Sequence, residues 1–189
     1  MLKKIVVIGP ESTGKSTLCK QLADHYDTLW CPEFAREYLL QHGMKYTYDD
    51  LLTIAKGQIE LEQKTESLVR ISESGVQRTK DKSYSQLLFI DTNMYVMKVW
   101  CEFVFGKCHE YILEQIARRE YHLYLLCNID LPWVHDQLRE YPDIERRQIL
   151  YQMYKSLMAN QTVPCVEISG NTEQRFSAAV AAVHTLVNQ

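Results

Sequence analysis

The sequence lacks the features that mark several large protein classes. No apolar run approaches the roughly 20 residues of a membrane-spanning helix. The net charge of −3 gives no general attraction to nucleic acid or to anionic membranes. The six cysteines form no C-x-x-C pair and no Cys/His pattern with zinc spacing, and most lie in apolar segments, where a reduced thiol packs well. We therefore expect a reduced, cytoplasmic protein that acts on neither nucleic acid nor membranes.

The chain also has no low-complexity linker and no internal repeat. Its 189 residues, 46% of them hydrophobic, are enough for one domain with a sizeable core but few for two. A lysine pair and a short apolar run at the start faintly resemble a signal peptide, but a glycine-containing stretch from residue 9 interrupts them. The expected organisation is a single domain over residues 1–189.

What the sequence does contain is a phosphate-binding motif. Residues 9–16, Gly-Pro-Glu-Ser-Thr-Gly-Lys-Ser, fit G-x-x-x-x-G-K-[ST], with a strand-like segment before them and a helical segment after them. The glycines let backbone N–H groups point into one concavity, to which the helix N-terminus adds partial positive charge. In this motif Lys15 reaches the β- and γ-phosphates, and the Ser16 hydroxyl binds Mg²⁺. The candidate ATP-binding residues are Gly9, Glu11, Ser12, Thr13, Gly14, Lys15, Ser16 and Thr17.

Strand-like and helical segments alternate along the chain. The expected strands are 4–8, 28–32, 86–91, 121–128 and 163–168. The expected helices are 17–23, 33–39, 48 to about 80, 94–105, 110–119, 144–158 and 172–187. A capping box T-x-x-D at 47–50 and a capping aspartate, Asp143, mark two of the helix starts. This alternation predicts an α/β fold: a doubly wound, five-stranded parallel sheet with helices on both faces.

Asp91 ends one of the expected strands. An acidic residue in this place is typical of a Walker B aspartate, which holds Mg²⁺ directly or through water. Asp91, Thr92 and Asn93 also precede a helix, and each of them is a good helix cap. The two interpretations are compatible, and we name Asp91 as a catalytic and metal-binding candidate beside Ser16.

Glu33 and Arg36 form a second candidate pair. Glu33 ends the second expected strand, and ligands gather at the carboxyl ends of strands in a doubly wound sheet. A carboxylate here could accept a proton from an attacking hydroxyl, while the guanidinium could hold the acceptor or a phosphate. The alternative is an ordinary ion pair between neighbours on a surface helix.

A charged segment at about 135–147 contains Arg139, Arg146 and Arg147. Phosphoryl transfer builds negative charge on the migrating group, and arginines in a closed, dry site stabilise it. We therefore expect this segment to be a mobile lid, with Arg139 and Arg146 as catalytic candidates. The alternative is a solvated loop with charges at a helix end.

These motifs together resemble the ribosylnicotinamide kinase domain of NadR-type proteins. The resemblance spans nearly the whole chain and rests on residues 9–17, Pro32–Tyr38 (PEFAREY), Asp91–Asn93 (DTN), Asn128–Trp133 (NIDLPW), Ser169–Asn171 (SGN), and Arg175 with Phe176. It implies a P-loop nucleoside/nucleotide-kinase-like fold with ATP and Mg²⁺ as cofactors. The implied reaction is transfer of the γ-phosphate to the ribosyl 5′-hydroxyl of nicotinamide riboside, giving nicotinamide mononucleotide in NAD biosynthesis.

The resemblance also implies that residues 169–171 lie near the adenine, which makes Gly170 and Asn171 binding candidates, and that the arginine segment is the lid. Members of the bifunctional type carry an adenylyltransferase domain as well, for which 189 residues leave no room. The partner implied is a small nucleoside.

Other readings of the motifs remain open. A deoxynucleoside or mononucleotide kinase is the nearest of them. A regulatory GTPase would need an N-K-x-D motif to recognise guanine. The nearest match is Asn128-Ile129-Asp130, which lacks the lysine and has too short a spacing between asparagine and aspartate. A P-loop ATPase without a small acceptor would more naturally show an extra helical domain. Which carboxylate, Glu33 or Asp91, acts as the base stays undecided from the sequence.

Overall fold

The computed structural model describes residues 1–74 and 86–188 and is built on a five-stranded parallel sheet. The strand order is β2-β3-β1-β4-β5, and every neighbouring pair is parallel. The strands are β1 (Lys3–Ile8), β2 (Trp30–Cys31), β3 (Leu87–Asp91), β4 (Leu123–Cys127) and β5 (Cys165–Ile168). The predicted fold is confirmed, although β2 is shorter than the expected 28–32.

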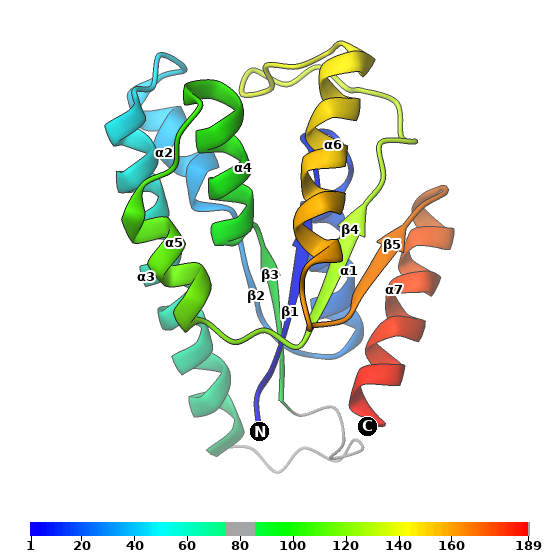
Figure 1. Cartoon of the computed structure of the whole chain (residues 1–189). Coiled ribbons are helices and arrows are strands. Elements are labelled where there is room, and N and C mark those ends of the chain that lie inside the picture. The colour runs from blue at the N-terminus through cyan, green and yellow to red at the C-terminus, as the bar shows by residue number, and fades with distance from the viewer. Residues whose placement is uncertain (75–85, 189) are drawn as a thin grey trace.

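Alternate side chains of the central strands point to opposite faces of the sheet. One face, formed by residues such as Val7, Phe89 and Leu125, packs against α1 (Lys15–His25) and α7 (Thr172–Val187). The other face, formed by residues such as Val6, Leu88 and Ile90, packs against three of the remaining helices. Figure 1 shows α1 behind the sheet and α6 in front of it. Both faces are covered, which explains why β1, β3 and β4 are nearly continuous apolar runs.

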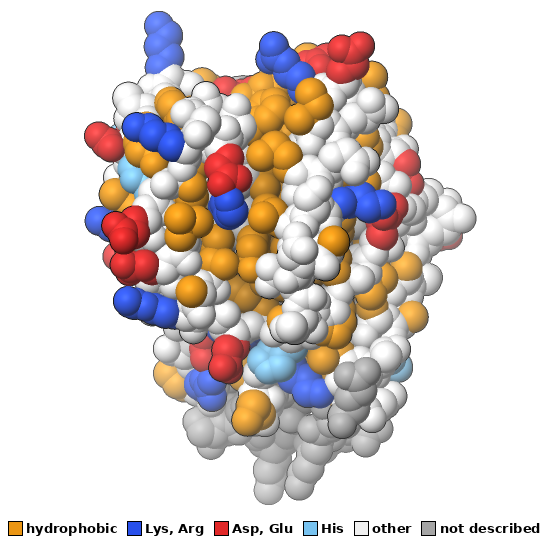
Figure 2. Space-filling model, viewed as in Figure 1, with side chains coloured by type: hydrophobic (Ala, Val, Ile, Leu, Met, Phe, Trp, Pro, Cys, Tyr) orange, Lys and Arg blue, Asp and Glu red, His pale blue; other side chains and the backbone are white. Residues whose placement is uncertain are grey.

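The second face carries α3 (Tyr48–Ser74), α4 (Met94–Phe105) and α6 (Ile144–Ala159), with α2 (Phe34–His42) and α5 (Glu110–Arg118) at the side of α3 and α4. Apolar residues of α2, α3, α4 and α5 form a separate small core. Figure 2 shows hydrophobic side chains along the hollow between α4 and α6. No helix within the described residues is both long enough and apolar enough to cross a membrane.

The helix boundaries follow the predicted signals closely. In the capping box, Thr47 N donates to Asp50 Oδ2 at 2.7 Å and Asp50 N donates to Thr47 Oγ1 at 3.3 Å. Asp143 Oδ1 accepts from Arg146 N at 2.8 Å, as expected for the cap of α6. The long third helix is confirmed as far as residue 74, and the rest of its expected length lies outside the described residues.

The loops that follow β1, β2, β3 and β4 all leave the sheet at the carboxyl ends of the parallel strands. In a doubly wound sheet this edge is where ligands bind, at the point where the chain turns from one side of the sheet to the other. The phosphate-binding motif, Glu33 and Asp91 therefore meet at one edge of the molecule, the upper edge in Figure 1.

Candidate active site

The phosphate-binding motif forms a tight loop between β1 and α1. Gly9 has φ +137°, and a Cβ there would lie 2.7 Å from the carbonyl oxygen of Cys127, so only glycine fits. Gly14 has φ +78° and is the N-cap residue immediately before α1. Thr13 Oγ1 donates to the Pro10 carbonyl at 2.8 Å and braces the loop from inside. The backbone thus has the curled shape that the motif predicts.

The two residues that follow the second glycine contact the loop and β3. Lys15 Nζ donates to the Pro10 carbonyl at 2.9 Å, across the loop. Ser16 Oγ donates to Asp91 Oδ2 at 2.5 Å. Asp91 is fully buried because it ends β3 on the face that α1 covers. Burial, reinforced by the nearby charge of Glu33, raises the pKa of Asp91 to about 7.

Asp91 has one oxygen without a partner. Its Oδ1 is buried and accepts no hydrogen bond from any residue in the described part of the chain. A buried carboxylate oxygen beside a serine hydroxyl is a donor set of the kind that Mg²⁺ takes. Asn93, rather than Asp91, caps α4, since Asn93 Oδ1 accepts from Tyr95 N at 3.0 Å. Asp91 therefore does not cap the helix, and its Oδ1 has no hydrogen-bond partner among the described residues.

Thr92 joins the two candidate carboxylates. It has φ +75°, a conformation that is uncommon for residues other than glycine. Its Oγ1 donates to Glu33 Oε1 at 3.3 Å. Glu33 precedes the first turn of α2 and is half-buried at the wall of a cavity. The sequence offered Thr92 only as a helix cap, and its unusual backbone could not be read from residue type.

A cavity of about 340 Å³ extends from the phosphate loop to a second, largely apolar compartment. The loop and Asp91 form one end of it. The other end lies between α2, α4, α6 and the connection that joins β4 to α6, residues 128–143. Its apolar wall includes Val96, Val99, Trp100, Phe103, Leu150 and Tyr154. The cavity thus has room for a phosphate donor and, beside it, for a planar or apolar group.

The β4–α6 connection (residues 128–143) lies over the phosphate loop and is bonded to it. Glu11 Oε1 accepts from Trp133 Nε1 at 3.2 Å and from Tyr141 N at 2.7 Å, while Glu11 Oε2 accepts from Glu140 N at 2.9 Å. Ser12 Oγ accepts from Val134 N at 3.0 Å. Glu11 and Ser12, which were expected to serve ATP, thus bond to the segment above the loop.

The arginines named as candidates from the sequence have different partners in the structure. Arg36 pairs with Asp136 of the connection, with 2.9 Å between Nη2 and Oδ2, and not with Glu33. This guanidinium holds the pKa of Asp136 below its usual range. Arg139 lines the cavity and donates to the Val134 carbonyl at 2.5 Å. The expected lid at 135–147 therefore has a non-helical part, up to residue 143, and a helical part, the first turn of α6.

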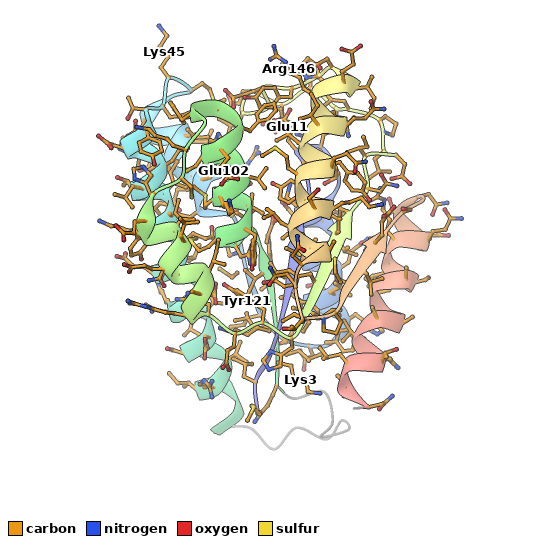
Figure 3. All side chains as sticks on the ribbon, viewed as in Figure 1. Lys3, Glu11, Lys45, Glu102, Tyr121 and Arg146 are labelled. Atoms are coloured by element: carbon orange, nitrogen blue, oxygen red, sulfur yellow. The ribbon has the colours of Figure 1, made fainter. Side chains whose placement is uncertain are left out.

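Arg146 and Arg147 lie in that first turn and differ in their surroundings. Arg146 does not line the cavity: its side chain is 60% exposed, near Asp143, and Figure 3 shows it at the upper rim of the molecule. Arg147 is buried, donates to the Leu131 carbonyl at 3.5 Å, and has its pKa lowered by burial. Of the two candidate lid arginines, only Arg139 faces the cavity.

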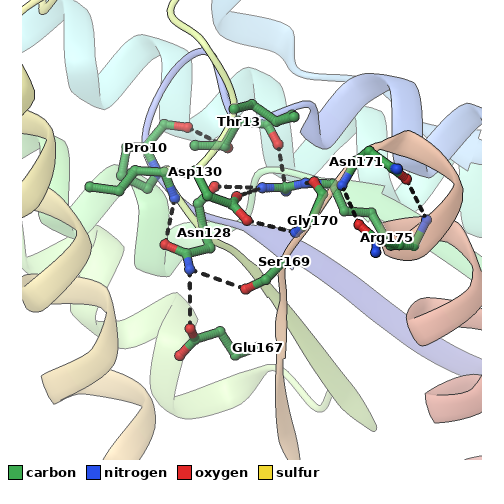
Figure 4. Close-up of polar contacts among 12 residues, drawn as sticks. Pro10, Thr13, Asn128, Asp130, Glu167, Ser169, Gly170, Asn171 and Arg175 are labelled. Carbon is green, nitrogen blue, oxygen red and sulfur yellow. Dashed lines mark hydrogen bonds and ion pairs between the residues drawn. The ribbon is translucent and has the colours of Figure 1, made fainter.

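Gly170 and Asn171 lie beside the phosphate loop and outside the cavity lining. Gly170 N donates to Asp130 Oδ2 at 2.6 Å, and Asn171 forms a complete capping box at the start of α7. Arg175, with a side chain only 4% exposed, connects this corner to the loop (Figure 4). It donates to the carbonyls of Gly170 at 2.7 Å, Thr13 at 3.1 Å and Asn128 at 3.0 Å, and pairs with Asp130. Sequence reasoning missed this role of Arg175.

Comparison with known proteins agrees with this geometry. The family model described as "AAA domain" matches residues 4–175. The chain is 23% identical over 193 residues to the trifunctional NAD biosynthesis/regulator protein NadR of Salmonella typhimurium (strain LT2) and 22% identical over 193 residues to the protein of that name from Escherichia coli (strain K12). Each alignment covers 100% of this chain and 43% of the relative, so the chain spans less than half the length of these curated relatives.

Two solved structures share the fold. A crystal structure of NadR protein in complex with NR superposes with a TM-score of 0.70 at 20% identity, over 100% of this chain and 51% of the other. A crystal structure of NadR protein in complex with NAD and AMP-PNP superposes with a TM-score of 0.69 at 18% identity, over 100% and 50%. The similarity to NadR-type proteins that the motifs indicated is confirmed. Because the family model matches almost the whole chain, this protein belongs to the AAA domain family.

Proposed function

We propose that this chain is an ATP-dependent kinase that transfers the γ-phosphate to the 5′-hydroxyl of nicotinamide riboside, giving nicotinamide mononucleotide for NAD biosynthesis. The observation that carries the proposal is the two-part cavity. Its first part is the phosphate loop with Lys15, Ser16 and Asp91. Its second part is an apolar wall bordered by a carboxylate, Glu33, at the carboxyl ends of the strands. A donor and an acceptor can therefore meet in one cavity.

The donor half follows from the loop. Its backbone N–H groups and the N-terminus of α1 favour the phosphates of a nucleotide, and Lys15 can turn from the Pro10 carbonyl towards them. The NadR structure with AMP-PNP, an ATP analogue, supports ATP as the nucleotide.

The acceptor half follows from the wall. The aromatic side chains of Trp100, Phe103 and Tyr154 suit a planar ring that carries a positive charge, since such rings attract cations to their faces. The pyridinium ring of nicotinamide riboside has this character. The NadR structure with NR supports the same ligand.

Mg²⁺ fits the residues at the loop. Ser16 and Asp91 would hold it, with Asp91 Oδ1 as an oxygen that has no other partner among the described residues. No group of three or more His, Cys, Asp or Glu side chains in that part of the chain is placed to bind a metal. Few protein ligands, completed by phosphate oxygens and water, are usual for Mg²⁺. When bound, it would neutralise charge on the phosphates.

Glu33 is the better candidate for the base. Both carboxylates line the cavity, but Asp91 is fully buried and one of its oxygens bonds to Ser16, whereas Glu33 is half-buried. Glu33 would accept the proton of the attacking hydroxyl, and Thr92 would hold the carboxylate in place. Arg139 would face the migrating phosphoryl group from the lid side, where its charge stabilises the transition state.

One assay tests this function. ATP consumption should be measured against a panel of nucleosides and mononucleotides that includes nicotinamide riboside, with the phosphorylated product identified by mass spectrometry. We expect the fastest turnover, and a product heavier by one phosphate, with nicotinamide riboside. A Lys15→Ala variant, which should keep the fold, provides the control for contaminating kinases.

Three results would contradict the proposal in different ways. Preference for another nucleoside or for a mononucleotide would leave the kinase activity standing but show that the proposed substrate is wrong. Phosphate release that needs no acceptor would make the protein an ATPase, and a preference for GTP over ATP would favour a GTPase.

A further inference from the structure

A carboxylate in the phosphate loop is unexpected, because it adds negative charge where an anion binds. Glu11 is such a residue, and all three of its hydrogen bonds go to the β4–α6 connection. Two of the donors are consecutive backbone N–H groups, of Glu140 and Tyr141, and the third is the Trp133 indole. Hydrogen bonds to an ionised acceptor are stronger than neutral ones. Glu11 therefore joins the loop to the segment above it.

The connection continues from Glu140 to the other half of the cavity. The Tyr46 hydroxyl donates to Glu140 Oε2 at 2.8 Å, and Trp100 Nε1 donates to the Tyr46 oxygen at 2.9 Å. The Tyr46 ring also packs edge-on against the Trp100 ring, with 4.9 Å between centroids. Trp100 lies on α4 and forms part of the apolar wall. An unbroken series of contacts thus runs from Glu11 through Glu140 and Tyr46 to Trp100.

We propose that Glu11 is a positioning residue that latches the β4–α6 connection over the phosphate loop, and that Glu140 and Tyr46 extend this latch to the acceptor wall at Trp100. The latch is a property of the chain itself; its part in catalysis rests on the proposed kinase function. Closing the connection places Arg139 against the cavity and shields the phosphates from water. The Arg36–Asp136 ion pair is exposed and adds little to this closure.

A carboxylate suits this position better than an amide does. The three donors use both oxygens of Glu11: Trp133 and Tyr141 share Oε1, and Glu140 uses Oε2. Glutamine has one acceptor oxygen and one NH₂ group, so it must lose at least one of these bonds and place a donor against a donor. Alanine loses all three. The two substitutions therefore form a graded pair.

The latch is tested on the ligand-free chain by amide hydrogen exchange. In Glu11→Ala, exchange at the Glu140 and Tyr141 amides should become about tenfold faster, the effect of losing one hydrogen bond of ordinary strength. In Glu11→Gln, the exchange rate should rise at one of these two amides, or rise by less than tenfold at both. Amides of Leu87 and Leu88, at the end of β3 away from the phosphate loop, should exchange as in the wild type and report that the fold is intact. Unchanged exchange at both lid amides in Glu11→Ala would overturn the latch.

The extension to Trp100 is tested by the indole N–H resonances of the three tryptophans. Glu11→Ala should shift the indole N–H resonance of Trp133, because Glu11 bonds directly to that indole. It should also shift the resonance of Trp100, which Glu11 reaches only through Glu140 and Tyr46. Tyr46→Phe should shift Trp100 while leaving the exchange of the Tyr141 amide at its wild-type rate. A Trp100 signal that responds to Tyr46→Phe but not to Glu11→Ala would show that the latch ends at Glu140.

Kinetics separates the latch from the proposed function. With a closed lid required for transfer, Glu11→Gln should lower kcat about tenfold, change the KM for ATP less than about twofold, and raise hydrolysis of ATP relative to transfer. Equal losses in kcat and in ATP affinity would mean that Glu11 binds the nucleotide directly. That result would contradict the latch. If the wild type phosphorylates no nucleoside while the exchange results hold, the kinase proposal fails and the latch stands.

Discussion

The Ser16 hydroxyl lies 2.5 Å from Asp91 Oδ2, although 75 residues separate the two in the sequence. The contact joins the first turn of α1 to the end of β3. It depends on the parallel pairing of β1 with β3, in which Val7 lies opposite Asp91, two residues before the phosphate loop begins. A serine and an aspartate are thereby held together at the point where the nucleotide phosphates are expected.

Replacing Asp91 should remove the response to magnesium. We expect Asp91→Asn to lower turnover about 100-fold or more, because the developing charge on the phosphates loses its counter-ion. Asn93→Ala is a matched control two residues away: it removes the cap of α4 and should cost about 1 kcal/mol of stability while keeping Mg²⁺ dependence. The measurement is turnover as a function of Mg²⁺ concentration for both variants. Near-normal turnover and Mg²⁺ dependence in Asp91→Asn would refute the metal assignment.

Asp91 should also give the metal-free protein a pH-dependent stability. Its folded pKa of about 7 lies above the ordinary value of about 3.9 for an unfolded aspartate. Folding therefore takes up a proton between these values, and the free energy of unfolding should fall as pH rises from about 4 to about 7. Asp91→Asn should lack this component. Urea denaturation of both proteins at several pH values in the presence of a chelator measures the difference; parallel curves would show that the carboxyl is not perturbed.

Glu33 and Glu37 provide a test of the base, since both are carboxylates at the start of α2. Glu33 faces the cavity, whereas Glu37 is exposed and bonds to Gln41. Glu33→Gln should lower kcat about 100-fold or more and leave the KM for ATP nearly unchanged. Glu37→Gln should change neither. Steady-state kinetics with the best acceptor from the panel provides both values, and a shift in KM alone for Glu33→Gln would indicate binding instead of catalysis.

The arginines of the lid should differ in importance. Arg139→Ala should lower kcat about tenfold or more, because its charge faces the cavity. Arg146→Ala should stay within about twofold of wild type, because its side chain is exposed and held near Asp143 and above the Tyr141 ring. Measured turnover of the two variants ranks them directly. The opposite ranking would mean that α6 moves inward when substrates bind.

Arg175 should matter for stability more than any surface arginine. Arg175→Met leaves three carbonyls without their donor and the Asp130 carboxylate without its partner, which should cost about 3 kcal/mol. Arg118→Met is the control: Arg118 is 70% exposed, and the change should stay within about 0.5 kcal/mol. Chemical denaturation measures both; similar values would show that the buried network contributes no net stability.

Local patterns in the sequence were enough for most of the fold. The capping box at Thr47–Asp50 and the cap at Asp143 were predicted because each involves neighbours three residues apart. The phosphate loop was predicted because the glycines that shape it lie within one motif. The α4 boundaries agree with the structure for the same reason, since Asn93 and Gly106 flank the helix.

Contacts between distant residues could not be predicted in this way. The sequence pattern pairs Arg36 with Glu33, three residues earlier, but its partner is Asp136, 100 residues later. The place of Glu11 in the motif indicates ATP binding, but its hydrogen bonds reach as far as Tyr141, 130 residues away. Arg146 and Arg147 are adjacent and identical in type, and only the packing of α6 decides that the second is buried. Such choices depend on how elements meet, which no short pattern contains.

The position of Arg175 limits how far this protein can be shortened. Its side chain reaches from the first turn of the C-terminal helix, α7, to the Thr13 carbonyl in the phosphate loop. Deleting α7 would therefore remove the support beneath a loop that lies more than 150 residues earlier in the chain. A minimal nucleotide-binding fragment cannot stop at the last strand, even though every residue of the phosphate-binding motif lies in the first tenth of the sequence.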